Sequence, residues 1–132
     1  MAVDVLIVED DVALARLIAL MLRRQNISSE LVESSEDAIA ALTSQNYCVV
    51  VLDLLLGEFK SGYYVIDAIR RIPVADRPYV IVVTGAQMTT VANLDRGIVS
   101  AIFVKPVQLE VLAMAVRAAV IEDPDVKKGD RR

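Results

Sequence analysis

The sequence predicts a doubly wound α/β domain in which five parallel strands alternate with five helices. Four short apolar runs are rich in β-branched residues, which is typical of strands buried on both faces of a parallel sheet, and a fifth, weaker run suits an outer strand. The segments between these runs carry apolar residues at helical spacing, as right-handed crossover connections require. With 132 residues, 55% of them hydrophobic, the chain can bury its core as one domain.

The first half of the chain is predicted to fold as strand, helix, strand and helix. Residues 3–8 form a buried-strand run that ends at three consecutive acids. The next helix covers residues 12–26, with arginines near its end, where the helix dipole favours them. Residues 27–32 alternate only partly and suit an outer strand, and the polar run 34–37 opens a second helix. The apolar positions of the first helix follow helical spacing, and they are Leu14, Leu17, Ile18, Met21 and Leu22. The inward face of the second helix is predicted to be Ala38, Ile39 and Leu42.

The second half begins with residues 47–56, an apolar run that supplies the central strand. A polar loop over 57–62 leads into a helix that Pro73 stops. The remaining elements are predicted at residues 78–83 (strand), 87–96 (short helix), 101–104 (strand) and 108–121 (helix). The folded domain therefore spans residues 1–121, and residues 122–132 are expected to be a charged tail or linker stub.

Composition narrows the possible chemistry. No apolar run is long enough to cross a bilayer and no export signal precedes the first strand, so we expect a cytoplasmic protein without a membrane partner. The net charge of −4 argues against a nucleic-acid partner. The chain has no histidine, and its one cysteine, Cys48, lies in a buried strand, where it acts as a small hydrophobe. Carboxylates, lysine and hydroxyls must therefore carry any reaction.

Asp53 is the first candidate site residue. It is the lone charge in the run from Tyr47 to Leu56. Burying an uncompensated carboxylate costs on the order of several kcal/mol of folding free energy. This aspartate therefore needs cations, a metal or hydrogen-bond donors beside it. The alternative is that Asp53 caps a turn after the strand, a common role for aspartate.

The acidic run Glu9-Asp10-Asp11 is the second candidate. Asp11 suits the start of the following helix, where a negative charge is favourable. Glu9 and Asp10 cannot both share that role, and a divalent cation with oxygen ligands explains them better than a merely solvated turn. Magnesium fits this set, because it takes few protein carboxylates and prefers to share a phosphate.

Further polar residues follow the fourth and fifth strands. Thr84 comes after one and Lys105 after the other, so the carboxyl ends of the strands collect acids, a hydroxyl and an amine. In open parallel sheets this edge is where functional groups gather. A lysine and a hydroxyl opposite a metal-binding acidic group can hold a phosphoryl group, and Asp53 is then placed to accept it as an aspartyl-phosphate.

These residues resemble the receiver domain of bacterial response regulators over about residues 3 to 121. The matching motifs, in order, are Val8-Glu9-Asp10-Asp11, Val51-Leu52-Asp53-Leu54, Val83-Thr84-Gly85 and Val104-Lys105-Pro106. The resemblance implies a flavodoxin-like, chemotaxis-regulator-like fold of strand order 2-1-3-4-5. It implies a phosphorylation-controlled module of a two-component system rather than an enzyme with an external substrate.

The resemblance also assigns roles to single residues. It implies that Glu9, Asp10, Asp53 and the backbone carbonyl of Leu55 hold Mg²⁺. Asp53 would accept phosphate from a histidine kinase or histidine phosphotransfer protein. Thr84 would be the switch hydroxyl and Lys105 the phosphate-contacting lysine, with a cis bond before Pro106.

The chain departs from the family pattern at several positions. Gly57-Glu58 replaces the usual Pro-Gly, and Ile102 replaces the usual aromatic switch residue three positions before the lysine. Leu55 and Ala86 are apolar where the family often has polar side chains near the hydrolytic water. On the last helix, a second apolar stripe indicates a contact surface for a second copy or a target, unless that helix is buried all round. The stripe consists of Val111, Met114, Ala118 and Ile121.

Two other functions compete with this interpretation. A magnesium-dependent phosphatase or mutase would use a similar aspartyl nucleophile, but it wants a second aspartate two residues later, where this chain has Leu55. A pseudo-receiver would dock partners without phosphate and would have no need of the complete site.

Overall fold

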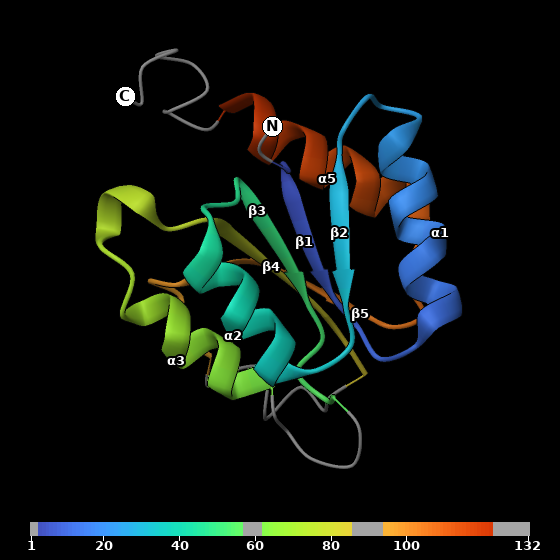
Figure 1. Cartoon of the computed structure of the whole chain (residues 1–132). Helices are drawn as coiled ribbons and strands as arrows, with labels where there is room; N and C mark the ends of the chain where they lie inside the picture. The colour runs from blue at the N-terminus through green and yellow to red at the C-terminus, as the bar shows by residue number, and fades with distance from the viewer. Residues whose placement is uncertain (1–2, 57–61, 86–93, 123–132) are drawn as a thin grey trace.

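The computed structural model describes residues 3–56, 62–85 and 94–122, and it has a central parallel sheet with helices on both faces (Figure 1). The strands are β1 (Val5–Val8), β2 (Ser29–Val32), β3 (Val49–Leu52), β4 (Tyr79–Thr84) and β5 (Val99–Val104). The α-helices are α1 (Val12–Arg23), α2 (Ser35–Ser44), α3 (Gly62–Arg70) and α5 (Leu109–Glu122), and a short 3₁₀ helix, η1, covers Val74–Asp76.

The sheet has the strand order β2-β1-β3-β4-β5, and every neighbouring pair is parallel. This confirms the predicted doubly wound fold and its flavodoxin-like order. The strand order reverses between β1 and β3, which is where ligands of such folds bind. Strand β3 pairs with β1 and β4 along its two edges, and its residues are buried in the cores on both faces of the sheet, which explains its apolar sequence.

Alternate strand residues feed two separate cores. Leu6 and Val8 pack in the core covered by α2 and α3, whereas Val5 and Ile7 pack in the core covered by α1 and α5. The period of two along a strand makes this division automatic. Burial of these branched side chains on both sides of the sheet stabilises the frame that holds the strand ends in place.

Two helix starts follow the caps that the sequence predicts. Asp11 caps α1 by accepting a hydrogen bond from the Leu14 backbone N–H at 3.1 Å. The Ser34 hydroxyl likewise accepts from the Asp37 N–H at 3.1 Å at the start of α2. Each cap contributes about 1 kcal/mol, and each fixes where its helix begins.

Helix α1 ends earlier than predicted, and not all of its apolar positions are buried. It ends at Arg23 rather than at residue 26, because Asn26 adopts a left-handed backbone with φ of 63°. Leu17, one of those positions, is 48% exposed, while Ala15, Ile18 and Leu22 are buried. The spacing of these three buried positions follows one line along the helix, and Leu17 lies about 100° away from Ile18.

The described residues contain four α-helices rather than the predicted five. The predicted helix over 87–96 lies mainly outside the described residues, and its described end, from Leu94 to Arg96, is a bend and a turn. Ten of the eleven residues expected to form a charged tail also lie outside the described residues, while α5 continues to Glu122. No helix in the described ranges is long and apolar enough to span a membrane.

Candidate functional site

The parallel register brings four of the predicted site residues to one edge of the sheet. Val8 pairs with Leu52, so the residues that follow them, Glu9 and Asp53, become neighbours. The Asp53 N–H donates to the Val8 carbonyl at 3.0 Å. On the other side of the edge, the Lys105 N–H donates to the Thr84 carbonyl at 2.9 Å. Backbone pairing therefore positions these groups before any side-chain contact is made.

Lys105 joins the two buried carboxylates. Its Nζ lies 2.9 Å from Oε1 of Glu9 and 3.0 Å from Oδ2 of Asp53. Both acids are almost fully buried, whereas about a quarter of the lysine side chain is exposed. The ammonium thus offsets part of the cost of burying two negative charges.

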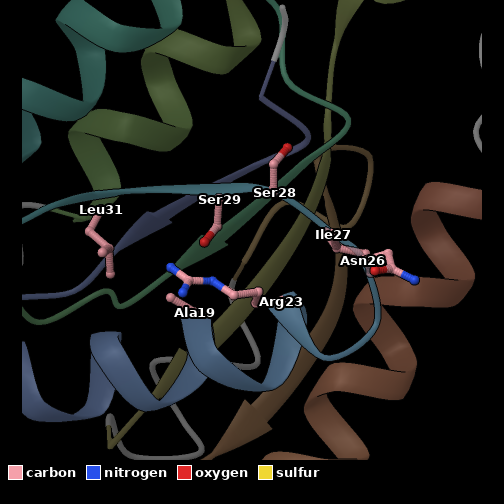
Figure 2. Close-up of a pocket in the computed structure, with 7 residues that line it drawn as sticks. All are labelled: Ala19, Arg23, Asn26, Ile27, Ser28, Ser29 and Leu31. Carbon is pink, nitrogen blue, oxygen red and sulfur yellow. The ribbon is translucent and has the colours of Figure 1, made fainter.

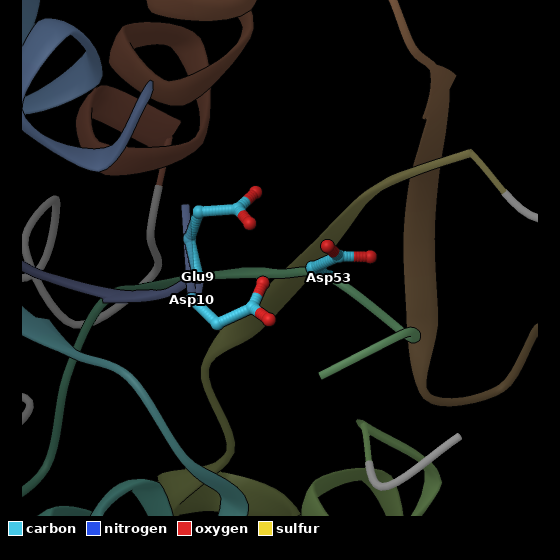
Figure 3. A group of neighbouring side chains, drawn as sticks. All are labelled: Glu9, Asp10 and Asp53. Atoms are coloured by element: carbon cyan, nitrogen blue, oxygen red, sulfur yellow. The ribbon is translucent and has the colours of Figure 1, made fainter. Parts of the chain in front are cut away.

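Asp10 completes an acidic cluster with Glu9 and Asp53 (Figure 3). One carboxylate oxygen of each residue lies within 4.8 Å of the others. Asp10 is exposed while Glu9 and Asp53 are buried, so the cluster opens toward solvent on the Asp10 side. Asp11 is not part of it, because its side chain caps α1. The predicted cap role of Asp11 is therefore confirmed, and Glu9 and Asp10 remain the candidates for a metal site.

The ionisation of Glu9 reflects this crowding. The pKa of Glu9 is raised from 4.5 to about 7. Burial is the largest cause and the nearby charge of Asp53 adds to it, while hydrogen bonds from Lys105 and from the Asp11 N–H, at 3.1 Å, limit the rise. For Lys105, burial alone would lower the pKa, but its bonds to Glu9 and Asp53 outweigh that effect and raise it. The lysine is therefore a permanent cation, while Glu9 is poorly compensated.

A tight turn follows Asp53 and holds its carboxylate. The Leu55 N–H donates to Oδ1 of Asp53 at 3.0 Å, while Oδ2 faces Lys105. The first residue of α3, Gly62, packs against this turn and donates its N–H to the Leu54 carbonyl at 3.1 Å. A Cβ at Gly62 would lie 2.5 Å from the Leu54 Cα and would also collide with the Asp53 carbonyl oxygen.

Gly62 is a positioning residue that the sequence analysis missed. The sequence does contain a signal for this role. Gly62 is a glycine at the first position of a helix, directly after the loop that follows Asp53, where other residues are usually favoured. Because the clash is with backbone atoms, no side-chain rotation can relieve it. Glycine is therefore required here by close approach.

The remaining predicted residues lie around the same edge. Thr84 is fully buried at the end of β4, and the Lys105–Pro106 bond is cis, as the resemblance implies. Ile102 is half-buried on β5 and packs against the core beneath α2 and α3. Ala86 and the residues at 57–58 lie outside the described part of the chain.

A sheet of this order with an acidic cluster and a lysine at its carboxyl edge defines the class of signal-receiver domains. The family model of the response regulator receiver domain matches residues 5–117. The chain belongs to this family, the receiver domain of two-component response regulators.

Individual relatives agree with the family assignment. The response regulator ArlR of Staphylococcus haemolyticus (strain JCSC1435) is 30% identical over 123 residues, covering 92% of this chain and 54% of the relative. The chain thus spans about half the length of that relative.

Two solved structures share the fold. A two-component response regulator from Clostridium difficile superposes with a TM-score of 0.80 at 21% identity, covering 93% of this chain and 99% of that one. A CheY-like receiver domain protein from Methanospirillum hungatei JF-1 gives 0.79 at 20% identity, with coverage of 92% and 97%.

Proposed function

We propose that Asp53 accepts a phosphoryl group from a histidine kinase or histidine phosphotransfer protein in a Mg²⁺-dependent reaction. The observation that carries this proposal is the position of the Asp53 carboxylate, which is buried beside Lys105 and within the acidic cluster of Glu9 and Asp10. A carboxylate held only as a turn cap would need neither partner.

The donor set fits magnesium. The three side chains of the cluster all offer hard oxygen ligands. Among the described residues, the nitrogen in contact with them is the Lys105 ammonium, which is a cation and has no lone pair for a metal. Glu9, Asp10 and Asp53 would hold the ion through their side chains and Leu55 through its backbone carbonyl. When bound, the ion neutralises negative charge on the carboxylates and the incoming phosphoryl group.

The chain's own groups supply the rest of the reaction. An oxygen of Asp53 attacks phosphorus, the P–N bond of the phosphohistidine breaks, and its electron pair returns to the imidazole of the donor. Lys105 keeps its positive charge beside the new phosphoryl oxygens. The Thr84 hydroxyl, at the end of the neighbouring strand, then donates a hydrogen bond to the phosphoryl group and reports its presence.

This proposal makes the module a regulator that phosphorylates and dephosphorylates itself and turns over no external substrate. An aspartyl phosphatase or mutase would need an acid two residues after Asp53, and the chain offers only the backbone N–H of Leu55 there. The receiver module is proposed to span residues 1–121 and to act in the cytoplasm, with residues 122–132 as a linker.

The partner surface is proposed to include α5. Met114 is 67% exposed, and Val111 and Ile121 are each about half exposed, so the predicted second stripe faces solvent within the described residues. Elsewhere on α5, Leu112 and Val116 are buried in the core covered by α1 and α5. A second copy of the chain or a target protein is the proposed occupant.

The decisive experiment measures intact mass after incubation with a small phosphoramidate and magnesium. The native chain is expected to gain one phosphoryl group, and Asp53→Asn is expected to gain none. Asp11→Asn is the matched control, because asparagine preserves the cap of α1 while removing one acid of the same cluster region. Phosphate retained by the Asp53→Asn variant would refute the assignment.

A further inference from the structure

A second concave surface lies away from the acidic cluster, between α1 and the outer strand β2 (Figure 2). It encloses about 450 Å³, within the range of ordinary ligand pockets. Its lining residues are Ala19, Arg23, Asn26, Ile27, Ser28, Ser29 and Leu31. Residues 26–28 precede β2, so this groove opens toward the amino ends of the strands, whereas Asp53 lies past their carboxyl ends.

The groove borders an unpaired sheet edge. Strand β2 is the first in the sheet order and pairs only with β1 among the described strands. The Ser28 carbonyl accepts from the Val5 N–H and the Val32 carbonyl accepts from the Glu9 N–H, each at 3.1 Å. Backbone groups alternate along a strand, so those of Ser29 and Leu31 point outward. An edge of this kind is a template for a further strand.

The side chains beside this edge combine apolar and basic surface. Leu31 is 43% exposed, and Ser29 and Leu31 point from β2 toward α1 (Figure 2). Arg23 runs from α1 along the groove beneath Ser29 and makes no side-chain hydrogen bond or ion pair with any described residue. The Ser28 hydroxyl is already engaged, since it bonds to the Asp4 carboxylate at 3.2 Å.

The local charge favours an acidic ligand. Arg16 lies two turns before Arg23 on the exposed side of α1 and carries the same charge. Two of the acids around the groove already accept hydrogen bonds, since Asp4 accepts from Ser28 and Glu30 accepts from the Tyr47 hydroxyl. Glu33 is exposed just past the end of β2 and does not line the groove. A carboxylate entering the groove would therefore meet an arginine that has no competing partner among the described residues.

We propose that an extended, acidic peptide segment of a partner protein binds here as an added strand. Its backbone pairs with the outward groups of Ser29 and Leu31, an apolar side chain packs on Ala19 and Leu31, and a carboxylate forms an ion pair with Arg23. This interaction is separate from phosphorylation, because the groove and Asp53 lie at opposite ends of the sheet. The same protein can therefore be phosphorylated and bound to this partner together.

The test uses amide chemical shifts of the isotope-labelled chain titrated at 150 mM salt. The probe is a blocked hexapeptide of sequence Val-Ser-Glu-Ser-Val-Ser, in which the valines and the glutamate project from the same face of the strand. Saturable shifts are expected at residues 19–31, and Arg23→Glu is expected to weaken binding at least tenfold. Arg24→Glu is the matched control, since Arg24 carries the same charge next in the chain but does not line the groove. Asp53→Asn is expected to bind as the native chain does, so failure of the proposed phosphorylation leaves this result unchanged.

Several results would overturn the proposal. Absence of shifts at millimolar peptide would exclude the added strand. Equal weakening by Arg23→Glu and Arg24→Glu would mean diffuse attraction rather than a site. Equally tight binding of the same hexapeptide with lysine in place of glutamate would exclude an acidic ligand, and the same shifts with sodium acetate alone would mean a small-anion pocket without strand pairing.

Discussion

Replacing Glu9 with glutamine is expected to stabilise the metal-free protein at neutral and alkaline pH. Burial and the neighbouring Asp53 raise the pKa of Glu9 from 4.5 to about 7. Between these values the folded state holds a proton that the unfolded state has released. The contribution of Glu9 to stability is therefore complete below pH 4.5 and is lost as the pH rises through about 7. Glutamine has no proton to lose, so the variant avoids this loss.

The size of the effect follows from the shift. A rise in pKa from 4.5 to about 7 corresponds at most to about 3 kcal/mol in the free energy of unfolding. Lys105 contacts Glu9 from a partly exposed position, and water screens this corner of the site. We therefore expect the stability difference between variant and native chain to grow by about 1 to 2 kcal/mol between pH 5 and pH 8.

Urea unfolding at pH 5, 6, 7 and 8 in the presence of EDTA measures this difference. Glu33→Gln is the control, because it removes the same charge from an exposed position outside the site. Adding magnesium at pH 8 should stabilise the native chain more than the Glu9→Gln variant, since the ion compensates the carboxylate that the variant lacks. A difference between Glu9→Gln and the native chain that stays constant over this pH range would refute the reasoning.

Three further predictions test the site and the partner surface. Gly62→Ala should destabilise the chain by about 1–3 kcal/mol in urea and slow phosphorylation from phosphoramidate, because its Cβ displaces the turn that holds the acceptor; unchanged rates would contradict this. Asp10→Ala should weaken magnesium binding in a titration far more than Asp11→Ala, and equal losses would mean that the acidic run is wrongly divided. The double variant Val111→Glu, Met114→Lys should reduce any self-association seen as molar mass in solution, and a monomeric native chain at micromolar concentration would exclude a dimer through α5.

The sequence was sufficient for the sheet and for the residues at its carboxyl edge. A strand buried on both faces has an unmistakable apolar pattern, and a charge that ends such a strand must be compensated. Once the strands are parallel, their carboxyl ends meet at one edge. Glu9, Asp53, Thr84 and Lys105 therefore come together as a consequence of register alone.

Other features depend on three-dimensional contacts that a linear pattern does not contain. Gly62 is needed because a helix start approaches the backbone after Asp53, and that approach is visible only when the chain is folded. Leu17 is apolar and lies at helical spacing from other apolar residues, so the sequence alone does not separate it from the core positions of α1. In the folded chain Ala15 is buried in the core, whereas Leu17 is exposed. Small residues at such contacts carry little hydrophobic signal.

The acidic cluster contains more negative than positive charge. Three carboxylates, those of Glu9, Asp10 and Asp53, face a single lysine, so the fully ionised cluster carries two excess negative charges. In the metal-free chain the pKa of Glu9 is raised chiefly by burial, and the charge of Asp53 adds to the rise. In the proposed function, a divalent cation would remove this excess and let the Asp53 oxygens approach an anionic phosphoryl donor. We therefore expect the metal-free fold to be weakest above neutral pH and a bound divalent cation to restore its stability.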